Sequence, residues 1–325
     1  MRLTLFFLIA LMPILVCSQS VSLTGKVICL DAGHGGTQQT DSYRVGPTGE
    51  REEWVNLRVA LLLQKLLESR GAQVIMTRTD DSFIPLTQRS EVALANKADI
   101  FVSIHHNATA DTSVNFPIIY FHGNSSENIS SVALGKQVGM ALREALFTAE
   151  TPVSLVSDHT VFAGVGASVL RNTYGIPAVL VEASFFTNPT EEQRLKSVAY
   201  NKREAEAYLT GIERFFTTKH KAISPKNSMV PIITPFKVFQ ESERMRPEAR
   251  LWREYFEKGE ELLKYENTDS LSLAYDLFTQ SARYFPDSFV AGLCHKKRAE
   301  LLKKSGRLSE ATEENLRHSQ YYIDM

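Results

Sequence analysis

Cysteine is scarce in this chain, with three among 325 residues. Cys17 falls in an apolar N-terminal segment, whereas Cys29 lies in a strand-like stretch and Cys294 in a distant helix-like stretch. We expect Cys29 and Cys294 to be reduced and buried as small hydrophobic side chains, even in an oxidising compartment. The sequence therefore excludes a disulfide-stabilised scaffold.

An excess of charge of one sign is also lacking. The net charge is -1, and the runs of basic residues are short, at 219–221 and 296–298. A basic face for nucleic acid therefore has little support, and we expect no nucleic acid partner. The glycine-rich stretch GHGGTQQT (33–40) lacks the G-x-G-x-x-G spacing of a dinucleotide-binding turn, which excludes that class as well.

No apolar run is long enough to span a bilayer comfortably. The run at 3–16 follows Arg2 and precedes small polar residues, a pattern typical of a signal peptide. We predict a signal peptide over residues 1–20, export, most simply to the periplasm, and no stable transmembrane span. Lipidation at Cys17 is the alternative, disfavoured because Val16 is larger than the residues usual before such a cysteine.

What is present fits a globular protein of two folded units. The length exceeds the size at which single cores usually stop growing, and 43% of the residues are hydrophobic while 22% are charged. Residues 21–222 form the first expected domain, and residues 223–246, with spaced prolines, read as an extended linker. Residues 247–325 have a wholly helical pattern.

The first domain alternates short apolar runs with longer amphipathic patterns. Near-continuous apolar runs are typical of strands buried on both faces, and the alternation predicts an α/β fold with a mostly parallel sheet flanked by helices. Expected strands lie at 26–33, 72–81, 99–108, 117–123 and 177–185, and expected helices at 55–71, 86–98, 126–146, 190–198 and 200–217.

Four residues suited to metal or acid–base chemistry stand where strands end or a helix begins. His34, His105 and Glu182 lie at or just past the ends of expected strands, where ligands of such folds bind, and Glu52 starts a helix that can face the same edge. Two imidazoles and one carboxylate with an open fourth position are the ligands of a hydrolytic zinc, which lowers the pKa of a bound water to about 7. Glu182 then suits the role of general base. From the residues alone, Glu50, Glu53 and Asp41 are alternatives to Glu52.

Five segments in the same order carry a resemblance to a known family. DAGHGG (31–36), the Glu before VNLRVA (55–60), SIHHNA (103–108), VLR (169–171) and LVEASFFTNP (180–189) resemble zinc-dependent N-acetylmuramoyl-L-alanine amidases, the amidase type 3 family. The resemblance covers residues 26–217. It implies a phosphorylase/hydrolase-like fold, peptidoglycan as substrate, and one Zn²⁺ per catalytic domain held by His34, Glu52 and His105, with Glu182 as the catalytic carboxylate.

Some polar residues near these motifs have two interpretations. His106 points to the opposite strand face from His105, so it either lines the cleft or is structural. Arg171 either pairs with a carboxylate structurally or reaches a carboxyl group of the peptide stem. Asn107 is a further candidate substrate contact, and His159 is interpreted first as a loop histidine and second as a substrate contact.

A built-in blocking helix is not expected. Amidases resembling this one commonly carry an inserted helix that covers the zinc site until an activator binds, but only the short stretch 108–116 separates two strands here. We therefore expect an open catalytic site.

The C-terminal pattern is similar to tetratricopeptide repeats. Ala274, Phe278, Ser281 and Pro286 fit the second helix of one repeat, and residues 299–311 fit the first helix and turn of the next. Two hairpins are fewer than such arrays usually need to stand alone, so we expect them to dock on the first domain and to bind a protein partner. A helical cap without a ligand is the alternative.

The leading functional hypothesis is an exported zinc amidase of peptidoglycan. A catalytically silent wall-binding scaffold is one alternative, disfavoured because all four site residues are present. A zinc peptidase acting on another exported peptide is the other.

Overall fold

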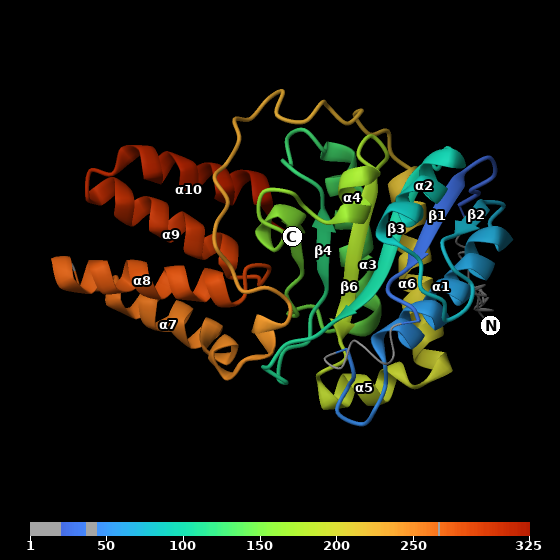
Figure 1. Ribbon diagram of the computed structural model, residues 1–325, viewed down its shortest axis with the longest axis horizontal. Helices are drawn as coiled ribbons and strands as arrows, with labels where there is room; N and C mark the ends of the chain where they lie inside the picture. Colours follow the sequence, from blue (N-terminus) through green and yellow to red (C-terminus); the bar gives the residue numbers. More distant parts are fainter. Residues whose placement is uncertain (1–20, 37–43, 266) are drawn as a thin grey trace, which may run out of the picture.

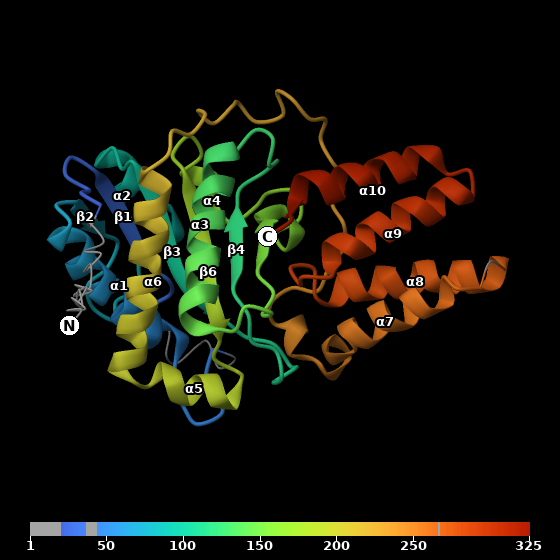
Figure 2. The same cartoon turned by 180° about the vertical axis from the view of Figure 1, so that it is seen from behind.

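A computed structural model describes residues 21–36, 44–265 and 267–325 of the chain. A mixed sheet of seven strands lies at its centre, with helices on both faces and a helical arm on one side (Figures 1 and 2). The predicted signal peptide and Asp41 lie outside these residues. Within them, no helix has both the length and the apolar character that crossing a membrane requires.

The sheet changes strand direction in its middle. Its order is β2-β1-β3-β6-β4-β5-β7, and the first four of these are parallel: β2 (Gln73–Met76), β1 (Val27–Ala32), β3 (Ile100–Asn107) and β6 (Ala178–Phe185). β4 (Ile118–Phe121) runs antiparallel to β6 and parallel to β5 (Ser154–Ser157), and β7 (Tyr322–Ile323) is antiparallel to β5. The carboxyl ends of β4 and β5 therefore lie at the opposite edge from those of β1, β3 and β6.

Helices cover the sheet in two layers. α1 (Glu52–Ser69), α3 (Ile129–Leu146) and α6 (Val198–Phe216) pack on one face, over a core of Val, Leu and Ile side chains (Figure 2). α2 (Leu86–Ala95) and α4 (Ser168–Asn172) pack on the other (Figure 1). α5 (Pro189–Leu195) follows β6, and its start is capped by Asn188, whose side chain accepts from the N–H groups of Thr190 and Glu191.

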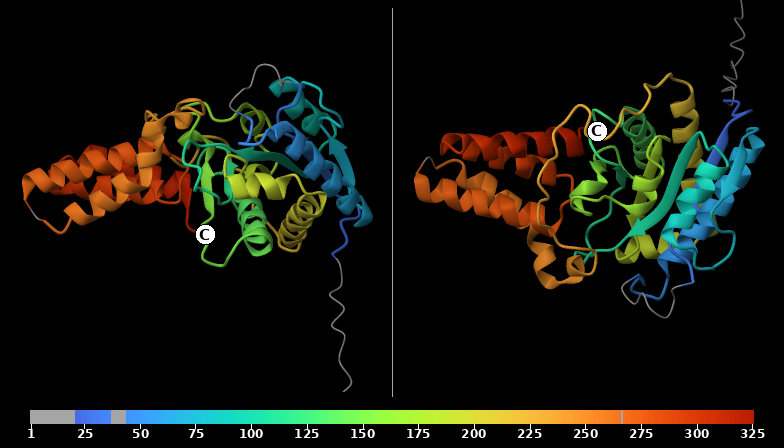
Figure 3. Two further views of the ribbon diagram at one scale, coloured as in Figure 1. Left: turned by 90° about the horizontal axis from the view of Figure 1, so that it is seen from below. Right: turned by 45° about the horizontal axis from the view of Figure 1, so that its top comes forward.

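The helical arm consists of two hairpins, α7 (Trp252–Leu262) with α8 (Thr268–Tyr284), and α9 (Ala291–Lys304) with α10 (Leu308–Tyr321). These four helices agree with the predicted helical pattern, and the arm projects from the β5–β7 side of the sheet (Figure 3). The similarity to tetratricopeptide repeats stays a prediction. The 223–246 segment is irregular apart from one 3-10 turn, η2 (Glu243–Met245), and it runs over the sheet region before it reaches the arm (Figure 1).

The arm is fixed to the sheet by a shared apolar core. Trp252 and Phe285 of the arm belong to the same buried cluster as Phe116, Tyr120 and Phe185 of the sheet region. The Trp252 ring lies 5.1 Å from that of Phe285, in a T-shaped arrangement. β7 then adds the end of the chain to the sheet itself. The arm therefore packs directly on the sheet region, next to β4 and β6.

The predicted α/β fold is confirmed, and some of its details differ from the expectation. The strand expected at 72–81 ends at Met76, because Thr77 and Arg78 turn toward the β1 loop. β4 is antiparallel to β6, so the sheet is mixed beyond its four parallel strands. β5 and β7 were not expected, because a strand of four residues and one of two carry too little periodic signal.

Candidate metal centre and active site

His34 stands on a tight turn just after β1. Its backbone has a φ of 58°, the left-handed region that costs a non-glycine residue about 1–2 kcal/mol. Gly33 before it packs directly on the ring of His105, since a Cβ there would lie 2.3 Å from that ring's Nε2. The turn therefore brings the two imidazole rings together edge to face, with their centroids 4.7 Å apart.

Two buried arginines hold the carbonyl groups of this turn. Arg89 donates to the carbonyl oxygens of Ala32 and His34 at 2.9 and 2.6 Å, and its guanidinium also pairs with Asp31 at 2.8 Å. Arg78 donates to the carbonyl oxygens of Ala32 and Gly33 at 2.7 and 2.8 Å. Such charge-assisted hydrogen bonds offset the strain of the turn. Neither Arg78 nor Arg89 was identified as a site residue from the sequence.

Glu52 is the first residue of α1 and is only 2% exposed. Its Oε1 atom lies 3.1 Å from His34 Nε2 and 3.0 Å from His105 Nδ1, so both imidazoles approach a single oxygen. Asn56, one turn later, donates to the same oxygen at 3.2 Å. Burial opposes ionisation of Glu52, but His34 and His105 outweigh it, so its pKa lies well below the usual range.

The neighbouring acids are used elsewhere. Glu50 pairs with Arg58 at 2.6 Å, and Glu53 pairs with Arg51 at 2.6 Å. Of the described acids in this segment, only Glu52 contacts the two histidines.

His105 lies on β3, directly beside Glu182 on β6. Burial lowers the pKa of His105, so its imidazole is neutral near pH 7, as a metal ligand must be. The ligand atoms of His34, Glu52 and His105 lie within 4.8 Å of one another. Two imidazoles and one carboxylate, largely buried and converging on one point, fit a zinc with an open position.

Glu182 stands next to this group without belonging to it. Its Oε2 atom is buried and has no hydrogen-bond partner within the protein. Burial raises the pKa of Glu182 well above its usual range, and the charges of Glu52 and Glu241 raise it further. Because a catalytic acid or base works best with a pKa near the working pH, this environment suits proton transfer.

Two residues beyond the first domain reach this site, and sequence reasoning missed both. Arg244 and Glu241 lie close enough to Glu182 for their charges to alter its pKa, Arg244 lowering it and Glu241 raising it. Arg244 is buried and pairs with Asp287 of the arm at 2.8 Å, while Glu241 pairs with Arg44 at 3.1 Å. The segment carries no motif, so only the tertiary packing reveals this proximity.

Comparisons with known proteins show the family of the chain. Residues 28–214, more than half of the chain, match the family described as N-acetylmuramoyl-L-alanine amidase, Amidase_3. The chain belongs to this family.

Individual relatives and solved structures are also similar. The uncharacterized protein YqiI of Bacillus subtilis is 34% identical over 202 residues, which cover 62% of this chain and 90% of that protein. The amidase AmiA of Salmonella typhimurium is 30% identical over 223 residues, covering 59% of this chain and 76% of AmiA. The structure of the amidase AmiC2 of Nostoc punctiforme is 29% identical with a TM-score of 0.52, covering 60% of this chain and 99% of that one.

Beside the four central residues of this amidase, His106 and Asn107 are buried. His106 Nδ1 lies 2.8 Å from Asn56 Oδ1, and its Nε2 lies 3.2 Å from Glu204. Burial opposes the charged form of His106, but Glu204 outweighs it and raises the pKa. Both ring nitrogens of His106 therefore have partners within the protein, which favours a structural role for this residue over a place in the cleft lining. Asn107 accepts from the N–H of Ala108, and its own Nδ2 has no partner in the protein.

Arg171 and His159 lie elsewhere in this amidase. Both line a cavity that also contains His122, which follows β4 at the edge of the sheet opposite to the metal-ligand group. Arg171 makes hydrogen bonds through Nη1 to the carbonyls of Val165 and Gly166, each at 3.2 Å. Neither residue joins the metal-ligand group, and the contact of Arg171 with substrate stays a prediction.

Proposed function

We propose that this amidase is an exported zinc enzyme that cleaves the amide bond between N-acetylmuramic acid and L-alanine in peptidoglycan. The observation that carries the proposal is the convergence of His34 and His105 on Glu52, with Glu182 beside them. The relative named AmiA is an N-acetylmuramoyl-L-alanine amidase, which supports the choice of bond. Export, most simply to the periplasm, rests on residues 1–20.

In this proposal, His34, Glu52 and His105 would hold the metal. Zinc bound there would polarise the scissile carbonyl and make water a stronger nucleophile near neutral pH. Glu182 takes the proton from the attacking water and delivers it to the leaving amine of L-alanine, and its raised pKa favours the second transfer. Arg244, held by Asp287, keeps positive charge near Glu182 while the carboxylate is ionised.

Access to the site and the role of the arm are parts of the same proposal. Between β3 and β4, residues 108–117 form no helix, which supports a site without a built-in block there. We propose the arm as the surface that binds a protein partner, and it also provides Asp287 behind Arg244.

Peptidoglycan digestion tests this function directly. Zinc-loaded residues 21–325 should release stem peptides that begin at L-alanine, detected by mass spectrometry. Glu182→Gln should retain zinc and lose about 10²–10⁴-fold in rate, because the general base is gone. Intact lactyl–peptide bonds after treatment with folded, zinc-loaded wild type would overturn the proposal in favour of a silent scaffold or another substrate.

A further inference from the structure

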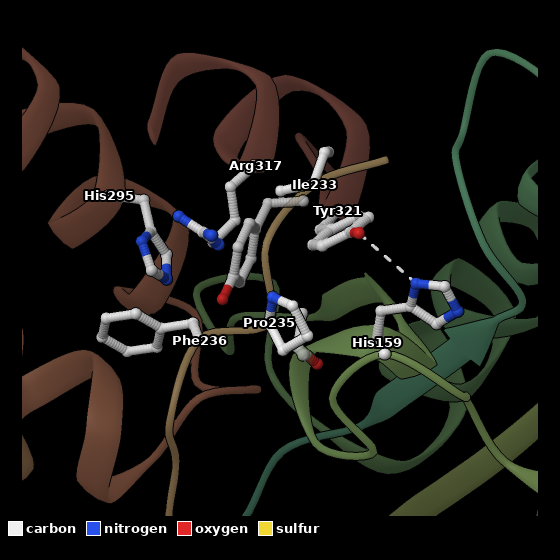
Figure 4. Close-up of a pocket in the computed structure, with 10 residues that line it drawn as sticks. His159, Ile233, Pro235, Phe236, His295, Arg317 and Tyr321 are labelled. Carbon is white, nitrogen blue, oxygen red and sulfur yellow. Dashed lines mark hydrogen bonds between the residues drawn. The ribbon is translucent and has the colours of Figure 1, made fainter. Parts of the chain in front are cut away.

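A second hollow of the molecule lies away from the metal ligands. This cavity of about 380 Å³ opens at the edge of the sheet where β4 and β5 end. Its walls come from three parts of the chain: His122 and His159 after those strands, Ile233 of the linker, and Tyr321 at the end of α10. Figure 4 draws an adjoining pocket that shares His159, Ile233 and Tyr321 with this cavity, and His159 Nδ1 lies 3.3 Å from the Tyr321 hydroxyl.

The polar floor of the cavity contains residue types that bind metals, but their geometry is not that of a metal site. The ligand atoms of His122, Asp158 and His159 lie within 4.8 Å of one another. However, Asp158 Oδ2 already lies 2.8 Å from His122 Nδ1 and accepts a hydrogen bond from the N–H of Ala167 at 2.7 Å. His159 Nε2 lies 3.9 Å from the other oxygen, Oδ1. The two imidazoles therefore do not converge on one oxygen, and the buried carboxylate is satisfied within the protein.

Positive side chains surround this floor. The Lys226 ammonium lies 4.8 Å from the ring centroid of Tyr174. Burial lowers the pKa of Lys226; the charge of Asp158 opposes this decrease, and the charge of Arg171 adds to it. Lys226 and Arg171 are thus close enough to repel each other, and a divalent cation beside them would be repelled as well. The opposing acid, Glu127, already accepts from the N–H groups of Asn227 and Met229 at 3.1 and 2.9 Å.

Apolar side chains form the rim beside these cations. Ile232 is 81% exposed and Val165 is 60% exposed, and both line the cavity. Exposed aliphatic groups next to two positive side chains favour a ligand that is anionic at one end and apolar beside it.

We propose that this cavity binds the carboxylate end of a short peptide. The carboxylate lies between Lys226 and Arg171, and the terminal aliphatic side chain packs on Val165 and Ile232. The volume of the cavity lies within the range of small-ligand pockets. This site is separate from the metal centre and does not depend on the amidase reaction.

Calorimetric titration of chelator-treated residues 21–325 tests the proposal without catalysis. The probe is a diacetylated Lys-D-Ala-D-Ala tripeptide, compared with its C-terminal amide and with the L-Ala-L-Ala stereoisomer. We expect the free acid to bind and the amide to bind at least about tenfold more weakly, because a charge-assisted bond is lost. Preference for the D-isomer assigns the ligand to wall stem peptides, and preference for the L-isomer assigns it to ordinary polypeptide ends.

Matched variants complete the test. Arg171→Gln and Lys226→Met should each weaken binding of the free acid about tenfold or more. Lys221→Met should not, because Lys221 is an exposed lysine just before the linker and outside the cavity. Unchanged melting temperature and circular dichroism show that the variants fold. Equal binding of acid and amide, or of inorganic phosphate and peptide, overturns the proposal. The proposal is also overturned if wild type binds a second zinc ion per chain and His159→Gln does not bind it.

Discussion

Two clusters of two histidines and one carboxylate lie at opposite edges of the same sheet, and they differ in what surrounds them. In the first, the imidazoles of His34 and His105 both approach Glu52 Oε1, at 3.1 and 3.0 Å. In the second, His122 holds one oxygen of Asp158 at 2.8 Å, and His159 stays 3.9 Å from the other. Residue types alone therefore do not distinguish a metal centre from a hydrogen-bonded floor.

The backbone around the clusters differs as well. In the His34 turn, the backbone carbonyls accept hydrogen bonds from Arg78 and Arg89. Both imidazoles are directed at Glu52. Around Asp158, the N–H of Ala167 approaches a carboxylate oxygen at 2.7 Å and competes with any ligand for it. Arg171 and Lys226 then add positive charge near the second cluster. The first environment favours a cation and the second an anion.

Removing one histidine from each cluster should separate them most sharply. His105→Gln should lower zinc affinity more than about a hundredfold, since even the outer partners of metal ligands contribute 10–100-fold. His122→Gln, which keeps a hydrogen-bond donor near Asp158, should leave zinc affinity unchanged. Competition against a zinc-binding dye measures both. If His122→Gln released zinc, or His105→Gln kept it, the assignment of the two clusters would be reversed.

The sequence predicted the first cluster because its residues stand at the ends of strands and at the start of a helix. His105 and Glu182 stand at the ends of expected buried strands, and a polar side chain at each such position indicated one shared site. The structure places these two strands side by side, with His105 opposite Glu182. Glu52 required the family resemblance, since Glu50 and Glu53 are equally acidic; the structure separates them by their pairs with Arg58 and Arg51.

The second cluster could not be predicted, because its parts meet only through topology. The four-residue strand β5, with serine at both ends, has no clear alternation, and the direction of β4 is not encoded in its own residues. Lys226 and Tyr321 reach His159 only because the linker and the arm fold back on the sheet. Arg244 reaches Glu182 for the same reason.

A glycine beside each cluster provides a finer comparison. A Cβ at Gly33 would lie 2.3 Å from the His105 ring. A Cβ at Gly166 would lie 2.5 Å from His122 Nδ1, and the backbone of Gly166 also has a positive φ of 73°. Each alanine variant should destabilise the fold by about 1–3 kcal/mol through overpacking.

The two alanine variants should differ in what they bind. Gly33→Ala should weaken zinc roughly 10–100-fold by displacing a ligand ring, like the loss of an outer partner. Gly166→Ala should keep the zinc affinity of wild type and weaken only the binding of the tripeptide. Zinc competition and calorimetry on both variants check this, and equal zinc affinity in Gly33→Ala and wild type would contradict it.

The smallest expected effect concerns the pH dependence of stability from the second cluster. Burial lowers the pKa of His159 below 6.5, with His122 and Lys226 adding to the decrease and Asp158 opposing it. The unfolded chain then binds the proton more readily than the folded protein, so this contribution to stability is present above pH 6.5 and is lost as the pH falls below it. Between pH 7.5 and 5.5, chelator-treated wild type should lose more unfolding free energy than His159→Gln, by at most about 1.4 kcal/mol per pH unit for one proton. Urea titrations across this range measure the difference. Parallel profiles would mean that His159 is as readily protonated in the folded protein as in the unfolded chain, which would remove burial as a difference between His159 and an ordinary loop histidine.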